Sequence, residues 1–243
     1  MIVAEYDMNN LKIGAIGWRN HAADVIEALK TSCGFDVSCI YHPHYEPEVS
    51  AGSSNFNDLL KTDAVMILSP NDTHMDYIET RRGAGYDGYI FCEKPPVTDL
   101  DELKRLKQID SSKIMYDFSL RHSDFVRQLK SIVPKIGEVI SSTVWVTHGL
   151  AFKQSYPSSW RANIQRHTHG LLETVSIHWI DLMLSLFGPS AAANHKSRNV
   201  AGTGSSTDTS IVTIRHAAGP YSTIITSYAA PFMLRLLIIG TDG

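Results

Sequence analysis

The sequence predicts an α/β protein with a doubly wound parallel sheet, followed by an α+β domain with an open antiparallel sheet. Up to about residue 120, short β-rich runs alternate with helical stretches, whereas strand candidates follow one another near the C-terminus. The chain has 243 residues, of which 43% are hydrophobic and 19% charged, which suits two modest domains with their own cores. We therefore expect domains at residues 1–120 and 121–243.

The first domain has strand candidates separated by helices. The strand candidates are residues 11–16, 35–41, 64–68, 89–92 and 113–118, with a helix over 22–30. The helix after Pro96 is well marked, because Thr98 or Asp99 can cap it and Leu103 and Leu106 line one side. Strands that alternate with helices form a parallel sheet covered on both faces.

The second domain has a different order of elements. We predict helices over 124–133 and 171–187, and strands over 139–147, 209–216, 221–228 and 234–239. A long polar loop separates the first strand from the second helix. The order is typical of an antiparallel sheet with one open face, and we expect a second copy to cover it in a homodimer or homotetramer.

Composition excludes several function classes. Lys and Arg total 22 against 25 Asp and Glu, a formal charge of −3, so we expect no nucleic-acid partner. Apolar runs stay far below the ~20 residues that span a bilayer, so we expect no membrane partner. Three cysteines cannot all pair and are not spaced as a zinc cluster. We therefore expect a soluble, cytoplasmic protein whose cysteines are reduced.

A glycine turn follows the first strand candidate. The dinucleotide fingerprint G-x-G-x-x-G/A here has Gly17, Arg19 and Ala22 at its three positions. Glycine permits a tight turn into a helix whose N-terminus attracts a pyrophosphate, so we expect a dinucleotide-binding Rossmann domain. The arginine departs from the pattern, and a merely structural turn is the alternative.

The second strand candidate lacks the acid that holds an adenosine ribose in NAD-binding proteins. It ends in Tyr41-His42-Pro43-His44. His42 or His44, together with Arg19, could face the 2′-phosphate of NADP; a surface histidine in a loop is the alternative. The choice between NAD and NADP therefore stays open.

Two further segments resemble a known family. Residues 63–74 read Asp-Ala-Val-Met-Ile-Leu-Ser-Pro-Asn-Asp-Thr-His, and residues 89–95 read Tyr-Ile-Phe-Cys-Glu-Lys-Pro. They resemble the D-A-V-x-I-x-T/S-P-N-x-x-H and V-x-C-E-K-P signatures of the glucose-fructose oxidoreductase and inositol dehydrogenase family, also called Gfo/Idh/MocA. The resemblance continues through Arg121, Trp160-Arg161 and the helix that carries His178.

The resemblance implies an enzyme that uses NAD or NADP to oxidise or reduce a hydroxyl-bearing carbon of a sugar, cyclitol or nucleotide sugar. Carried over residue by residue, the implied cofactor contacts are Gly17, Trp18, Arg19, Asn20, His42, Ser69, Pro70, Asn71, His74, Glu93, Lys94, Arg121, Trp160 and Arg161. The implied substrate contacts are Lys94, Thr174 and His178.

Alcohol oxidation needs an acceptor for the hydroxyl proton. His178 matches the family's acid/base histidine, and Lys94 would stabilise alkoxide charge. We expect these two residues, from separate domains, to converge on one cleft. Thr174 stands where the family often has aspartate, and Glu173 should not replace that acid, because one residue turns about 100° around a helix.

Several alternatives stay open. Glu93-Lys94-Pro95 could be an exposed charge pair, and His178 a core histidine. His167, His169 and His178 suggest a metal, but no carboxylate or cysteine has matching spacing, so we expect none. In the same loop, Tyr156, Trp160 and Arg166 could bind sugar or pyrophosphate, with plain loop packing as the alternative.

Two competing classes remain. One is a non-catalytic, dinucleotide-binding sensor, suggested by Thr174 and Arg19. The other is a truncated fragment, suggested by the turn sequence that ends at Gly243.

Overall fold

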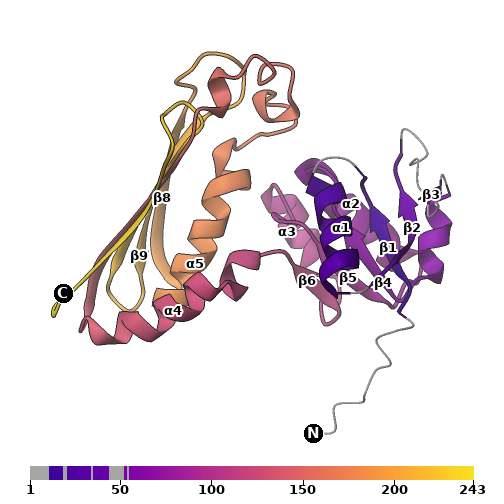
Figure 1. Cartoon of the computed structure of the whole chain (residues 1–243), viewed down its shortest axis with the longest axis horizontal. Helices are drawn as coiled ribbons and strands as arrows, with labels where there is room; N and C mark the ends of the chain where they lie inside the picture. Colours follow the sequence, from indigo (N-terminus) through magenta and orange to yellow (C-terminus); the bar gives the residue numbers. More distant parts are fainter. Residues whose placement is uncertain (1–10, 19–20, 34, 44–51, 54) are drawn as a thin grey trace, which may run out of the picture. The chain divides into compact units, whose positions relative to one another are not determined.

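The computed structural model describes residues 11–18, 21–33, 35–43, 52–53 and 55–243. The chain forms two compact units, Met1–Asp117 and Phe118–Gly243 (Figure 1). The change of pattern expected near residue 120 falls close to this division. The functions assigned to the two domains stay predictions.

Unit 1 contains a six-stranded parallel sheet in the order β3-β2-β1-β4-β5-β6. Its strands are β1 (Ile13–Ile16), β2 (Val37–Tyr41), β3 (Gly52–Ser53), β4 (Ala64–Ile67), β5 (Tyr89–Cys92) and β6 (Ile114–Tyr116). The chain winds outward in one direction from β1 and in the other from β4, so the order reverses between these two strands. The doubly wound Rossmann sheet predicted from the sequence is confirmed, and its switch point lies beside β1.

Helices cover both faces of this sheet (Figure 1). They are α1 (His21–Cys33), α2 (His74–Gly83) and α3 (Leu100–Leu106). Ala22 of α1 packs against Ala15 and Met66 on one face, whereas Ile78 of α2 and Leu106 of α3 belong to the cluster on the other. Two separate apolar cores therefore hold the sheet rigid beneath its strand ends.

The cap predicted for the helix after Pro96 forms as expected. The Asp99 side chain accepts the backbone N–H groups of Asp101 and Glu102, each at 2.8 Å. Thr98 adds a second interaction, because its N–H donates to the Glu102 carboxylate at 2.6 Å. These bonds satisfy donors that the helix itself leaves unpaired.

Unit 2 contains a five-stranded sheet in the order β11-β7-β10-β9-β8. Its strands are β7 (Val139–Thr147), β8 (Ser190–Arg198), β9 (Thr209–His216), β10 (Tyr221–Ser227) and β11 (Met233–Gly240). Adjacent strands run antiparallel as predicted, except that β7 and β10 are parallel. The sheet is therefore mixed rather than purely antiparallel.

Strand β8 was not predicted from the sequence. Its residues are small or polar, without a β-branched side chain, and all nine are exposed. It pairs with β9 alone, as an edge strand, so backbone hydrogen bonds rather than burial hold it in the sheet.

One helical layer packs on the unit 2 sheet. It contains α4 (Asp124–Ile132) and α5 (Ile177–Phe187). The predicted single helix over 171–187 instead opens with a π-helical turn at Leu172–Ser176, which continues into α5. Leu182 and Met183 of α5 pack against Val144 and Ile214 of the sheet. Among the described residues, no helix is long and apolar enough to cross a membrane.

Candidate active site

The turn after β1 requires glycine at position 17. Gly17 has φ +106°, and a β-carbon there would lie 2.8 Å from the carbonyl oxygen of Leu68. Its N–H donates to Tyr41 O at 3.0 Å, and the N–H of Leu68 donates to Ile16 O at 2.8 Å. The ends of β1, β2 and β4 are thereby tied together just before α1, where bare backbone suits a pyrophosphate.

The residues that flank this turn include several of the expected cofactor contacts. Trp18 is half-buried against the core on the α1 face, and His42 is half-buried after β2. Arg19, Asn20 and His44 lie outside the described residues. Their predicted contacts with a cofactor stay predictions.

The segment after β4 is held by His74 and Thr73. Ser69 and Pro70 are half-buried and Asn71 is buried. Thr73 Oγ1 donates to Ser69 Oγ, with a separation of 2.7 Å. His74 is fully buried, and its Nδ1 and Nε2 lie 2.7 Å from Pro95 O and 2.8 Å from Ser69 O.

The His74 ring therefore bridges the segments that follow β4 and β5. Burial lowers the pKa of His74, because it penalises the charged ring more than the two carbonyl contacts favour it. Both ring nitrogens are engaged by protein atoms. This geometry indicates that His74 holds the two segments in place.

Three titratable side chains meet at the end of β5. Glu93 is 7% exposed, and its Oε1 lies 2.8 Å from Nε2 of His21, the first residue of α1. Asp117, which follows β6, joins them, and one potential ligand atom from each residue lies within 4.8 Å of the others. Lys94 follows Glu93 directly and is half-buried, and the Lys94–Pro95 peptide bond is cis.

The state of Glu93 follows from these neighbours. Burial raises the pKa of Glu93, as do its hydrogen bond with Asp117 and the charge of Asp117, while Lys94 and His21 oppose the shift. Glu93 therefore keeps its proton to higher pH than an isolated carboxylate.

In unit 2, Arg121 is engaged with the helix that carries His178. Its Nε and Nη2 donate to the two carboxylate oxygens of Asp181, a bidentate pair. The guanidinium also lies 5.8 Å from the centre of the Phe118 ring. The predicted cofactor contact of Arg121 stays a prediction.

Trp160 and Arg161 lie in a short 3₁₀ helix of the polar loop, Trp160–Ala162. The Arg161 guanidinium stacks 4.6 Å from the centre of the Trp160 ring. The Arg161 carbonyl accepts from the ring of His167, with Nδ1 at 2.9 Å. The loop thus presents an aromatic face and a cation side by side.

Thr174 lies in the π-helical turn, and His178 is the second residue of α5; both are half-buried. Thr174 Oγ1 lies 3.0 Å from the hydroxyl of Tyr228. Glu173 is buried, and its carboxylate accepts the N–H of His169 at 2.7 Å. This contact agrees with the expectation that Glu173 does not replace an acid at position 174.

The structure tests the metal alternative only within the described residues. There, His167, His169 and His178 do not form a group of ligand atoms close enough to share an ion. Tyr156 is buried, and its ring packs edge-on against Tyr228, with ring centres 6.1 Å apart. Tyr156 thus packs against the residue that follows β10, while substrate contacts of Tyr156, Arg166 and the histidines stay predictions.

The two halves of the predicted catalytic pair belong to different units. Lys94 lies in unit 1 and His178 in unit 2. Their convergence on one cleft stays a prediction.

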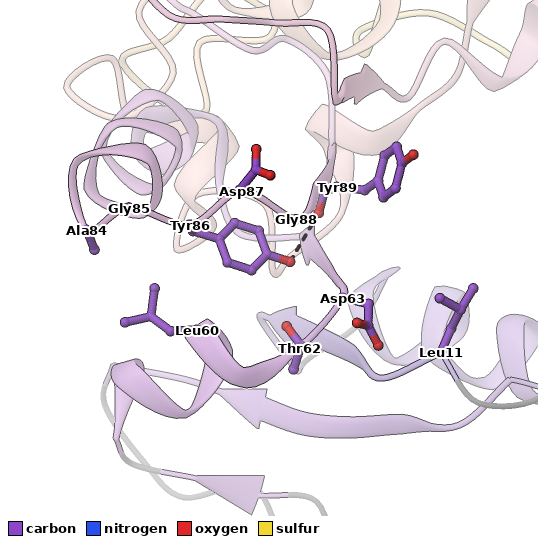
Figure 2. Close-up of a pocket in the computed structure, with 10 residues that line it drawn as sticks. All are labelled: Leu11, Leu60, Thr62, Asp63, Ala84, Gly85, Tyr86, Asp87, Gly88 and Tyr89. Carbon is purple, nitrogen blue, oxygen red and sulfur yellow. Dashed lines mark hydrogen bonds between the residues drawn. The ribbon is translucent and has the colours of Figure 1, made fainter. Parts of the chain in front are cut away.

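A cavity of about 460 Å³ opens at the end of the unit 1 sheet where its strands begin (Figure 2). Leu11, Asp63 and Tyr89, which line it, lie at the beginnings of β1, β4 and β5. Gly17, Ser69 and Glu93 follow the ends of the same strands. The cavity is therefore separate from the candidate cofactor site.

Sequence reasoning missed four residues. His21 and Asp117 complete the Glu93 cluster, while His148 and Tyr228 gather beside Thr174. Asp117, His148 and Tyr228 share a sequence signal, because each stands within one residue of the end of a strand. His21 opens the predicted helix α1. Polar side chains at such positions deserve to be considered as site residues even outside motifs.

Comparison with known proteins supports the same fold. A family model described as "Oxidoreductase family, NAD-binding Rossmann fold" matches residues 11–114, and one described as "GFO/IDH/MocA C-terminal domain" matches residues 126–243. Among solved structures, myo-inositol 2-dehydrogenase from Lactobacillus plantarum is similar with a TM-score of 0.76 and 20% identity, over 96% of this chain and 75% of that one.

Two curated relatives match more locally. Inositol 2-dehydrogenase of Rhizobium meliloti (strain 1021) is 29% identical over 131 residues, which cover 52% of this chain and 37% of that protein. D-xylose 1-dehydrogenase [NADP(+)] of Haloarcula marismortui is 28% identical over 104 residues, 41% of this chain and 28% of that protein. The matches thus span about a third of the relatives' length. With both domain models matched in order along the chain, the protein belongs to the Gfo/Idh/MocA family.

Proposed function

We propose that the protein is an NAD(P)-dependent oxidoreductase that acts on a hydroxyl-bearing carbon of a sugar, cyclitol or nucleotide sugar. The observation that carries this proposal is the meeting of Gly17, the start of α1 and Glu93 at one edge of the parallel sheet, with His21 bonded to Glu93. Ligands of doubly wound sheets bind at that edge, beside the switch point. The two dehydrogenase relatives support the same class of substrate.

The residues at this edge fit a nicotinamide dinucleotide. The close approach of Gly17 to Leu68 leaves room for no side chain, so phosphate groups can reach the backbone and the N-terminus of α1. Ser69, Pro70 and Asn71 follow β4 at the same edge and would hold the nicotinamide half, and His74 fixes their segment through Ser69 O. When bound, the cofactor supplies the hydride acceptor or donor.

The remaining chemistry belongs to the chain. In the direction of oxidation, His178 accepts the proton of the substrate hydroxyl, and the ammonium of Lys94 stabilises the developing alkoxide. In reduction, the same imidazole returns the proton. Both roles require Lys94 and His178 to reach one substrate oxygen.

The test has two stages. Titration with NADH and NADPH, followed by nicotinamide fluorescence, measures binding. Absorbance of the reduced nicotinamide then measures turnover of myo-inositol, D-xylose, D-glucose and nucleotide sugars. We expect Lys94→Ala and His178→Ala to lose at least 100-fold in kcat, the usual contribution of acid–base catalysis. The exposed residues Lys107 and His122 provide matched controls, Lys107→Ala and His122→Ala.

The outcomes separate the candidate functions. Parental turnover in both Lys94→Ala and His178→Ala would refute the catalytic assignment. Tight cofactor binding without turnover of any compound would favour a dinucleotide sensor, the second candidate. That candidate is supported by Thr174, which offers a hydroxyl bonded to Tyr228 and no carboxylate.

We also propose that a second copy of the chain covers the open face of the unit 2 sheet. The face of this sheet that points away from the helices carries exposed apolar side chains. They are Ile211 of β9, Tyr221 of β10, and Leu237 and Ile239 of the edge strand β11. We expect Leu237→Asp to convert a homodimer or homotetramer to smaller species in light scattering. A wild-type monomer at micromolar concentration would refute this proposal.

For location, we propose a reducing compartment, the cytoplasm. Cys39 and Cys92 are buried free thiols, and burial raises the pKa of both. Such thiols are inert and suit a compartment that keeps cysteines reduced. Fractionation of the cells that make the protein tests this, and recovery in an exported fraction would refute it.

A further inference from the structure

One group of side chains in unit 1 has the composition of a metal site. It consists of His21, Glu93 and Asp117, and one potential ligand atom from each residue lies within 4.8 Å of the other two. Within the part of the chain that the structure describes, no other three His, Cys, Asp or Glu residues come this close. Local spacing does not reveal the group, because its members belong to three separate elements.

Strand pairing holds two of the donors side by side. Cys92 of β5 lies opposite Tyr116 of β6, and the two strands are parallel, so the residues that follow them, Glu93 and Asp117, leave the sheet next to each other. The N–H of Glu93 donates to Ile67 O at 2.9 Å, and the N–H of Asp117 donates to Cys92 O at 2.8 Å. Two carboxyl groups that the backbone fixes side by side repel each other when ionised, and a cation between them removes that repulsion.

Helix α1 supplies the third donor. His21 is its first residue, and Nε2 of His21 lies 2.8 Å from Oε1 of Glu93. The next residue, Ala22, is buried in the core below the helix, which fixes the start of α1. A zinc ion about 2.1 Å from two ligands holds them about 3.4 Å apart in a tetrahedron. A displacement of about half an ångström therefore lets His21 and Glu93 share an ion.

The group is accessible from one side and supported on the other. The side chain of His21 is 66% exposed, whereas that of Glu93 is 9% exposed. An ion can therefore enter past the imidazole and reach a carboxylate that is shielded from water. Oε2 of Glu93 accepts the N–H of Lys94 at 3.3 Å, while Oε1 faces His21. Such a contact orients a carboxylate toward its metal.

The charges around the group select the kind of ion. The carboxylates of Glu93 and Asp117 together match the charge of a divalent cation. Lys94 and the N-terminus of α1 oppose a cation here, so simple attraction between charges is not enough to hold one. The ion must also bond well to imidazole nitrogen, which Zn²⁺ does, whereas Mg²⁺ and Ca²⁺ prefer oxygen ligands alone.

We propose that His21, Glu93 and Asp117 bind a divalent transition-metal ion, for which Zn²⁺ has the matching ligand preference. The chain supplies three ligands, so a fourth coordination position stays open to water or to another small oxygen ligand. The inference goes beyond the proposed function and does not rest on it, because no step of the hydride or proton transfer passes through the ion.

The test titrates the full chain with ZnCl₂ in a calorimeter, in the absence of any nicotinamide, and repeats the titration with MgCl₂. The variants are His21→Ala, Glu93→Gln and Asp117→Asn. His122→Ala and Asp110→Asn are the matched controls, because they remove an exposed histidine and an exposed acid outside the group. The melting temperature of each protein without metal shows whether it is folded.

We expect the wild type and both controls to bind one Zn²⁺ per chain at micromolar concentration, and Mg²⁺ far more weakly. Each of the three variants should bind Zn²⁺ at least about 100-fold more weakly, since even residues that only orient a metal ligand contribute roughly 10- to 100-fold to affinity. Equal Zn²⁺ affinity in the wild type and all three variants would show adventitious binding to surface histidines and would overturn the inference.

A second measurement needs no variant to be as stable as the wild type. The ring nitrogens of His21 are followed by ¹⁵N NMR in the wild-type chain, with the signals assigned by their loss in His21→Ala. We expect Zn²⁺ to shift the Nε2 signal of His21 in proportion to the bound fraction. Binding of one Zn²⁺ that leaves this signal in place would overturn the inference, as would the absence of Zn²⁺ binding to the wild type.

Discussion

Replacing Gly17 with alanine tests whether the β1 turn is built for close backbone approach. The φ of +106° costs an L side chain roughly 1–2 kcal/mol. The new β-carbon would also lie 2.8 Å from Leu68 O and 3.0 Å from Leu68 C, which are backbone atoms fixed by the pairing of β1 with β4. Relief of this overlap adds about 1 kcal/mol, so we expect a loss of about 2–3 kcal/mol in unit 1.

Gly85 provides the matched control. It also has a positive φ, +77°, but an added β-carbon there meets nothing within 4 Å. We expect Gly85→Ala to cost about 1 kcal/mol, from backbone conformation alone. The difference between the two variants therefore measures the close approach of Gly17 to Leu68.

Hydrogen exchange followed by mass spectrometry measures the loss of stability separately in each unit. For amides of β1 and β4 that exchange only when unit 1 unfolds, a loss of about 2–3 kcal/mol means exchange roughly 30- to 150-fold faster. Amides of β9 and β10 in unit 2 provide the internal reference. Equal effects of Gly17→Ala and Gly85→Ala would refute the reasoning, as would unchanged NADH affinity in Gly17→Ala.

Two further predictions concern ionisable groups. Burial and Asp117 raise the pKa of Glu93 above 4.5. The folded state therefore holds a proton at pH values where the unfolded chain has released it. This contribution to the free energy of unfolding is present at low pH and is lost as pH rises through the raised pKa. Glu93→Gln should flatten that decline in urea unfolding of unit 1, and an unaltered pH slope would contradict the assignment. Asp181→Asn should destabilise unit 2 by about 1–2 kcal/mol, because it weakens the bidentate pair with half-exposed Arg121. The exposed pair of Asp124 with Arg127 is the control, and a loss in Asp124→Asn as large as in Asp181→Asn would contradict the prediction.

Local patterns predicted most elements of the fold, because each depends on nearby residues. Strands β5 and β7 were predicted with their observed bounds, since β-branched and aromatic side chains mark both. The cap at Asp99 depends on backbone donors two and three residues away. By contrast, β8 has no β-branched or aromatic side chain to indicate a strand. It forms through backbone pairing with β9.

The candidate site was only partly predictable, for the opposite reason. His21 is 72 residues from Glu93, and the pair forms because α1 starts beside the end of β5. Tyr228 is 54 residues from Thr174, and their contact depends on the register of β10. Motifs identified Glu93 and Thr174, but partners set by sheet order are not encoded in local spacing.

The two units place their candidate site residues by the same geometric rule. In unit 1, parallel strands β1, β4 and β5 bring Gly17, Ser69 and Glu93 to one edge, although the chain separates them widely. In unit 2, the parallel pair β7 and β10 does the same for His148 and Tyr228, inside a sheet whose other pairs are antiparallel. An antiparallel β7–β10 pair would put the residues that follow the two strands at opposite ends, about 20 Å apart for strands of seven residues. The contacts of Tyr228 with His148 and Thr174 therefore depend on the one strand pairing that departs from the antiparallel pattern.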